Sequence, residues 1–159
     1  MRIYGRRLIP APPAAVWALV MTPDRLRRCL PGCERFEATG PDTFVASARI
    51  GVGFLRSTYS GTIRIVEQRY PEHLVLEVEG GGPLGTLRAR GTLTLAATGA
   101  PGEAGPPTAT SFVYDGEAQV GGRVAALGEP LLAATADRLI GLFFDCVAAH
   151  AAGLHDVHD

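Results

Sequence analysis

Between about residues 34 and 122, the hydrophobic positions of the chain recur with a period of two. In TFVASARIGV, for example, Phe44, Ala46 and Ala48 fall on the same face of an extended chain. The same alternation continues in STYSGTIRIVEQ, HLVLEVEG, GTLRARGTLTL and TSFVYDGEAQV. Such alternation is typical of antiparallel strands with one buried face and one solvated face. The pattern therefore predicts a continuous antiparallel sheet over this region.

The N-terminal segment predicts a strand followed by two short helices. Residues 2–9 form the expected strand, and the Pro12-Pro13 pair suits the first turn of a helix over AAVWALVM. Thr22 is placed to cap a second helix, PDRLRRCL, which has proline and aspartate in its first turn. We expect this helix to end at Cys29.

The C-terminal part predicts one long helix, from about residue 121 to about residue 152. Leu132, Ala136 and Leu139 begin an apolar face that continues through the helix. Pro130 should kink or interrupt this helix near residues 127–128. A sheet with one apolar face must be covered, and this helix is the only predicted element long enough to cover it. The sequence therefore predicts an α+β fold, in which a curved antiparallel sheet of about six to seven strands wraps around the long C-terminal helix.

Small residues occupy many mid-strand positions on the predicted inner face. They are Ala46, Ala48, Gly61, Gly80, Ala89, Gly91, Gly116 and Ala118. One interpretation is that they let the sheet bend and the helix pack closely. A second, compatible interpretation is that they leave an internal apolar cavity, the usual kind of site for a small ligand. The sequence leaves both open.

The candidate cavity carries no ionisable side chain apart from the phenols of Tyr59 and Tyr114. It would therefore suit a lipophilic molecule with one or two polar atoms. A buried tyrosine hydroxyl needs a partner, which protein, water or a ligand carbonyl could supply. The predicted lining residues are Trp17, Leu30, Phe44, Ala48, Ile50, Tyr59, Gly61, Ile63, Leu76, Val78, Leu87, Ala89, Gly91, Tyr114, Gly116, Ala118, Leu132, Ala136, Leu139, Ile140 and Phe143.

Composition narrows the classes of function. A chain of 159 residues suits one domain, which we assign to residues 1–153, with a short tail at 154–159. The net charge of −1 gives no field that would attract nucleic acid. The N-terminus lacks the apolar region of a secretory signal, and no apolar run approaches the ~20 residues that span a bilayer. We expect a cytoplasmic protein.

A local basic cluster stands out in this nearly neutral chain. It consists of Arg25, Arg27, Arg28 and Arg35. The plainest interpretation is a solvated helix face. The alternatives are docking of a protein partner or contact with anionic lipid headgroups, and the sequence does not decide between them.

The usual catalytic arrangements are not found in the sequence. It has no G-x-S-x-G elbow, no phosphate-binding loop and no H-E-x-x-H motif. GGGPLG at residues 80–85 lies between two strands, which favours a hairpin over an anion-binding loop. His155 and His158 are spaced for a metal, but chain ends are usually mobile. We therefore predict no catalytic residue and no metal site.

The cysteines pose a separate question, because Cys29 and Cys33 flank a Pro-Gly pair. Their C-x3-C spacing is not the C-x2-C spacing typical of zinc sites and redox pairs, and no second ligand pair lies nearby. Cys146 falls within the helix pattern and is interpreted as a core residue. We expect reduced thiols and a turn over residues 30–33, of type II if Gly32 adopts a positive φ.

Two blocks of the sequence resemble the CoxG family, the G subunits of carbon monoxide dehydrogenase. They are IPAPPAAVWALVMTPDRLRRCLPGCERFE and YDGEAQVGGRVAALGEPLLAATADRLIGLFFDCVAA. The family belongs to the START-like (SRPBCC) superfamily, so the resemblance implies a helix-grip fold around a hydrophobic cavity. It also implies an association with carbon monoxide dehydrogenase-type molybdenum hydroxylases and their recruitment to the membrane. Some members carry a long C-terminal extension suited to membrane attachment. This sequence ends at GLHDVHD, so we expect transient contact instead.

These observations lead to three hypotheses. The first is a non-catalytic binding or carrier protein that holds a quinone- or lipid-like molecule and serves a molybdenum-containing dehydrogenase at the inner face of the membrane. The second is a START-like enzyme of the cyclase or hydrolase type that acts on a hydrophobic substrate. The third is a scaffold for dehydrogenase assembly that docks through the basic cluster. No cofactor other than a bound quinone or lipid is expected, and no nucleic-acid partner.

Overall fold

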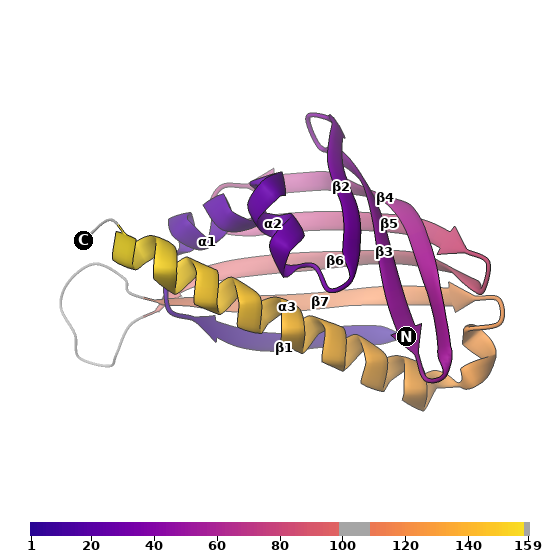
Figure 1. The fold of residues 1–159 in the computed structure, drawn as a ribbon. Helices are drawn as coiled ribbons and strands as arrows, with labels where there is room; N and C mark the ends of the chain where they lie inside the picture. The colour runs from indigo at the N-terminus through magenta and orange to yellow at the C-terminus, as the bar shows by residue number, and fades with distance from the viewer. Residues whose placement is uncertain (99–108, 158–159) are drawn as a thin grey trace.

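The computed structural model describes residues 1–98 and 109–157, with side chains described as far as residue 151. Within this part, seven strands form one antiparallel sheet that packs against helices (Figure 1). The strands are β1 (Arg2–Ile9), β2 (Cys33–Gly40), β3 (Thr43–Val52), β4 (Leu55–Arg69), β5 (His73–Gly82), β6 (Gly85–Thr98) and β7 (Ala109–Gly121). The helices are α1 (Pro13–Val20), α2 (Pro23–Cys29), the short 3-10 helix η1 (Ala125–Leu127) and α3 (Glu129–Val157).

The sheet follows the chain closely. Its order is β1-β7-β6-β5-β4-β3-β2. Each strand from β2 to β6 therefore pairs with the next strand in sequence, and β1 pairs with β7 as an edge strand. Figure 1 shows α3 crossing one face of this curved sheet, with α1 and α2 on the same side as α3. The predicted arrangement, a curved antiparallel sheet around a long C-terminal helix with two short helices after the first strand, is confirmed.

The outer face of the sheet carries the polar half of the alternating pattern. Glu77 on β5 accepts a hydrogen bond from Arg64 on β4 at 2.8 Å and one from Arg90 on β6 at 2.6 Å. The hydrogen bond from Arg64 is the main reason that the pKa of Glu77 lies below its ordinary value. Exposed ion pairs of this kind contribute little to stability. The sheet is therefore stabilised mainly by the apolar side chains that are buried on its inner face.

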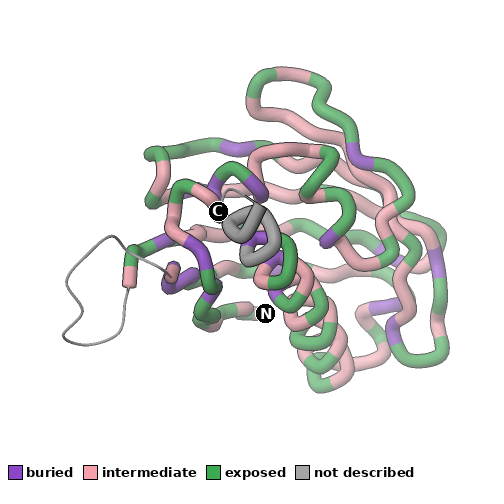
Figure 2. Tube along the Cα trace, turned by 60° about the vertical axis from the view of Figure 1, so that its left-hand side comes forward, coloured by how far each residue is buried: buried purple, intermediate pink, exposed green. Residues whose placement is uncertain are grey.

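The buried core is concentrated at one end of the molecule, where α1 and the C-terminal half of α3 meet β7. Phe112 of β7 and Phe144 of α3 pack edge to face, with ring centroids 4.8 Å apart. The buried residues described in α3 are Phe144, Val147 and Ala151. Before Phe144 the helix alternates between exposed and half-buried residues (Figure 2). The first half of α3 is therefore not packed tightly on the sheet.

The start of α3 differs from the prediction. The helix begins at Glu129 and not near residue 121, and η1 occupies part of the intervening segment. Gly122 and Gly128 both have positive φ, at 80° and 96°, so the chain turns at each of them. The interruption predicted near residues 127–128 is confirmed, and Pro130 lies in the first turn of α3, where proline is tolerated. The helix also continues to Val157, beyond the predicted end near 152.

The joins between the strands agree with the sequence pattern where they are described. The GGGPLG segment forms the β5–β6 hairpin, with Pro83 and Leu84 between the strands. The flexible loop predicted at residues 99–107 lies outside the described residues, as do His158 and the side chain of His155. In the described part of the chain, no helix combines the length and the apolar character needed to cross a membrane.

Candidate functional site

The loosely packed half of α3 leaves two apolar hollows between the helix and the sheet. The first chamber has a volume of about 410 Å³ and lies under the α1–α2 segment. The second chamber has a volume of about 300 Å³ and lies under the start of α3. Ile63, Val78 and Leu139 line both chambers and form the wall that they share. The two chambers are therefore neighbouring apolar spaces separated by these three side chains.

Most of the predicted lining residues face one of these chambers. Those at the first chamber are Leu30, Phe44, Ile63, Leu76, Val78, Tyr114, Leu139, Ile140 and Phe143. Those at the second chamber are Ala48, Ile50, Tyr59, Gly61, Ile63, Val78, Leu87, Ala118, Leu132, Ala136 and Leu139. Neither chamber is lined by Trp17, Ala89, Gly91 or Gly116. Trp17 is buried against Ile65 and Leu74.

Both interpretations of the small inner residues apply in the structure, and at some positions they apply together. Gly61 and Gly80 face each other across β4 and β5. A Cβ atom at Gly61 would lie 2.5 Å from the carbonyl oxygen of Glu79, and one at Gly80 would lie 2.8 Å from that of Ser60. These glycines therefore permit the close approach of two strands. The same two glycines also line the second chamber, as do Ala48 and Ala136, so small residues leave open space there as well.

The short helices provide a part of the first chamber that was not predicted from the sequence. Pro23 and Leu26 of α2 line it together with the preceding Val20 and Met21. The spacing of Pro23, Leu26 and Leu30 by three and four residues is the signal that could have shown one apolar side of α2. The other residues of the first chamber that were not predicted are Pro31, Phe36, Ile65, Leu74, Leu93, Phe112 and Phe144.

The two tyrosines of the inner face are in different surroundings. The Tyr59 hydroxyl is buried, and the described part of the chain offers it no hydrogen-bond partner. Burial raises the pKa of this phenol above its ordinary value, so it stays protonated at neutral pH. Tyr114 stacks on Phe144 with ring centroids 5.4 Å apart, and its hydroxyl lies over Gly5. Because an unsatisfied buried hydroxyl costs about 1–3 kcal/mol, Tyr59 is the polar group of the cavity that most needs a partner.

The basic cluster lies next to the first chamber. Arg25, Arg27 and Arg28 are exposed on α2. Arg35 on β2 is paired with Glu37 at 2.8 Å. Arg27 and Arg28 line a polar surface hollow that also includes Leu30 and Cys33. Since Leu30 lines both this hollow and the first chamber, the arginine surface adjoins the cavity.

The turn predicted over residues 30–33 is confirmed. Gly32 has a φ of 69°, and the Cys33 amide donates a hydrogen bond to the Leu30 carbonyl oxygen at 3.2 Å. Cys29 ends α2 and Cys33 begins β2, as expected. Cys33 is a free thiol.

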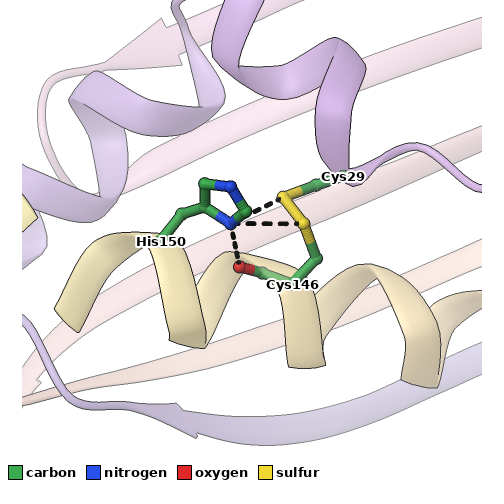
Figure 3. Close-up of side chains that lie close together, drawn as sticks. All are labelled: Cys29, Cys146 and His150. Atoms are coloured by element: carbon green, nitrogen blue, oxygen red, sulfur yellow. Dashed lines mark hydrogen bonds between the residues drawn. A yellow bond between two sulfur atoms is a disulfide. The ribbon is translucent and has the colours of Figure 1, made fainter. Parts of the chain in front are cut away.

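The expectation of reduced thiols is wrong for the other two cysteines. Cys29 forms a disulfide with Cys146 of α3, the residue that the helix pattern assigns to the core (Figure 3). The partners are 117 residues apart in sequence, and their Cα atoms are 5.3 Å apart. No local sequence motif predicts this pair, because the two cysteines come together only when α2 packs on α3.

His150 lies beside the disulfide. Its Nδ1 atom is 3.5 Å from Cys146 Sγ, 3.9 Å from Cys29 Sγ and 2.9 Å from the Cys146 carbonyl oxygen. Two cysteines and a histidine at these distances are a ligand set suited to zinc. Thiolates are the form of cysteine that binds metal, however, and two bonded sulfurs are not thiolates. In the disulfide form the group offers a metal only the histidine.

Comparisons with known proteins agree with this architecture. The sequence model of the CoxG family, the G subunits of carbon monoxide dehydrogenase, matches residues 5–152. The crystal structure of a conserved protein from Geobacillus kaustophilus superimposes with a TM-score of 0.87, at 30% identity over 96% of both chains. A comparison with curated proteins found no match.

Two more distant structures show the fold. A START superfamily protein from Mycobacterium smegmatis is similar with a TM-score of 0.74, at 9% identity over 96% of this chain and 98% of that chain. The Zhui aromatase/cyclase from Streptomyces sp. R1128 is similar with a TM-score of 0.66, at 14% identity over 96% of this chain and 93% of that chain. The described residues thus adopt the helix-grip fold of the START superfamily.

Proposed function

Because the chain belongs to the CoxG family of carbon monoxide dehydrogenase subunits, we propose that it is a non-catalytic carrier of a quinone- or lipid-like molecule. In this proposal it serves a molybdenum-containing dehydrogenase at the inner face of the membrane. Family membership and the START-type fold together suggest a protein that binds a hydrophobic ligand. The ligand part of the proposal is supported by the chemistry of the two chambers, and the dehydrogenase part by the family.

The observation that carries the proposal is the lining of the two neighbouring chambers. Their lining side chains are apolar, apart from two phenols and a few hydroxyl groups, and none carries a charge. Burial of apolar surface contributes about 25 cal/mol per Å², so a long hydrocarbon chain would gain much from these chambers. One molecule could occupy both chambers only if the shared wall of Ile63, Val78 and Leu139 moved.

The direct test is to identify what the purified protein carries. Solvent extraction and native mass spectrometry are expected to yield a stoichiometric quinone or lipid, or to show binding of an added one. Protein that is empty and binds neither would contradict the proposal. The enzyme hypothesis has one structural observation in its favour, the similarity to an aromatase/cyclase. A ligand recovered chemically unchanged after incubation supports a carrier, whereas conversion would support an enzyme.

The polar end of the ligand is assigned to the second chamber in this proposal, with a carbonyl oxygen accepting a hydrogen bond from Tyr59. We expect Tyr59→Phe to weaken binding of decylubiquinone about fivefold, because a net hydrogen bond is worth about 1 kcal/mol. The same change should leave unchanged the affinity for 1-N-phenylnaphthylamine, an apolar dye without a carbonyl. Fluorescence titration measures both. Tyr114→Phe is the matched control, and an equal loss in both variants would contradict the assignment.

Membrane contact is assigned to the arginines of α2. We expect Arg25→Glu/Arg28→Glu to lower partitioning onto vesicles with 30% phosphatidylglycerol by at least about tenfold, since each basic residue near an anionic surface is worth about 1 kcal/mol. Co-sedimentation measures the bound fraction. The control is Arg88→Glu/Arg123→Glu, which removes two exposed arginines elsewhere. Equal binding of both double variants would rule out a specific role for α2.

A further inference from the structure

Helix α2 forms one wall of the first chamber. Pro23 and Leu26 line the chamber, together with Leu30 just after the helix. Cys29 is the one buried residue of this seven-residue helix. The N-cap residue, Thr22, makes no side-chain capping bond to the helix. Cys29 is therefore the residue of α2 that reaches deepest into the core.

The bond from Cys29 to Cys146 joins this wall to the opposite one. Cys146 lies on α3 just after Ile140, Phe143 and Phe144, which line the same chamber. Figure 3 shows the disulfide bridging the end of α2 and the middle of α3, with the His150 ring beside both sulfurs. While the bond is intact, α2 cannot move away from α3 at this point.

We propose that Cys29 and Cys146 form a redox-active latch that controls exchange of the ligand through the α2 side of the first chamber. The disulfide holds α2 closed over the bound molecule, and reduction frees α2 to move. The effect on ligand exchange rests on the carrier function proposed above, whereas the effect on α2 itself does not.

The reductant required is a dithiol, either a small molecule or a protein of the thioredoxin type. Its thiolate attacks Cys146 Sγ, the less buried of the two sulfurs, and the bond breaks to release Cys29 as a thiolate. The second thiol of the reductant then displaces Cys146. Two electrons and two protons pass to the protein, and the reductant becomes a disulfide. The His150 ring lies beside both sulfurs, with Nδ1 3.5 Å from Cys146 Sγ and 3.9 Å from Cys29 Sγ.

The test compares wild type, Cys146→Ser and Cys33→Ser, and both the wild type and Cys33→Ser are measured oxidised and after reduction with dithiothreitol. Cys33 is the matched control, because it is a free thiol four residues from Cys29. The probe is 1-N-phenylnaphthylamine, whose release into phosphatidylcholine vesicles is followed by stopped-flow fluorescence. Hydrogen exchange at the amides of residues 25–29 reports on α2 without any ligand.

We expect the reduced wild type and Cys146→Ser to release the dye at least fivefold faster than the oxidised wild type. Both should also exchange the α2 amides at least tenfold faster, and Cys33→Ser should respond to reduction as the wild type does. Equal exchange in oxidised and reduced protein would overturn the latch. Faster amide exchange with an unchanged dye release rate would overturn its control of the ligand. If no form binds either the dye or decylubiquinone, the carrier function fails, and the amide exchange alone decides whether the disulfide holds α2.

The oxidation state itself is tested by counting thiols in denaturant. The disulfide leaves one free thiol of three in the oxidised protein. Three free thiols after air oxidation in the presence of a chelator would overturn the latch. The latch would also be overturned if the protein bound one zinc ion per chain before the chelator was added, and if His150→Ala abolished that binding. In that case a metal ion, and not a disulfide, would join α2 to α3.

Discussion

Reduction of the Cys29–Cys146 disulfide is expected to lower the free energy of unfolding by about 4 kcal/mol. The bond closes a loop between residues 117 apart, and a cross-link of this size restricts the unfolded chain strongly. Urea unfolding of wild type and Cys146→Ser, each with and without a non-thiol reductant, measures the effect. The reductant should shift the midpoint of the wild type only.

The control for this experiment is Cys33→Ser, which retains the disulfide and should keep the sensitivity to reductant. A wild-type midpoint that is the same with and without reductant would show that the bond does not constrain the unfolded chain. The stability measurement differs from the exchange measurement on α2, because it reports on the whole domain.

The second large effect is expected for Leu139→Trp, which should weaken binding of decylubiquinone by at least about tenfold. Leu139 lines both chambers, so the larger indole would intrude on the space needed by the ligand. Forcing extra volume into an occupied site costs roughly 1–3 kcal/mol. The empty protein should lose little stability, because the indole enters open space. Fluorescence titration and thermal unfolding measure the two effects.

Leu142→Trp is the matched control, on the same helix but 49% exposed. It adds the same side chain outside both chambers and should leave the affinity unchanged. Equal weakening by both variants would mean that the ligand does not occupy the space around Leu139. A strong loss of stability in Leu139→Trp alone would mean that the site is more tightly packed than the cavity volumes indicate.

Much of the fold could be predicted because the strands alternate so regularly. The run from Phe44 to Val120 keeps apolar residues on one side, and the register of the strands places them on the inner face. The start of α3 was harder to predict. The Ala-rich stretch after Gly122 favours a helix locally, but two glycines with positive φ divide it into a turn and a separate short helix.

The candidate site was predictable in its strands and less so in its helices. Alternation identifies inward strand positions such as Ile63 and Val78 without knowledge of tertiary structure. Whether Leu26 faces the same space depends on how α2 packs, which a seven-residue helix does not reveal. The partner of Cys29 could not be predicted at all, because its pairing with Cys146 arises from contact between distant segments.

The uneven packing along α3 means that the protein without a ligand has an incompletely filled interior. Phe144, Val147 and Ala151 finish a solid core at one end, while the half of the helix before them faces the two chambers. A hydrophobic guest in those chambers would supply the contacts that side chains supply elsewhere in the domain. The bound molecule would then contribute to the packing of the domain in addition to being the transported ligand. Release of the guest would leave both chambers unfilled until the next molecule bound.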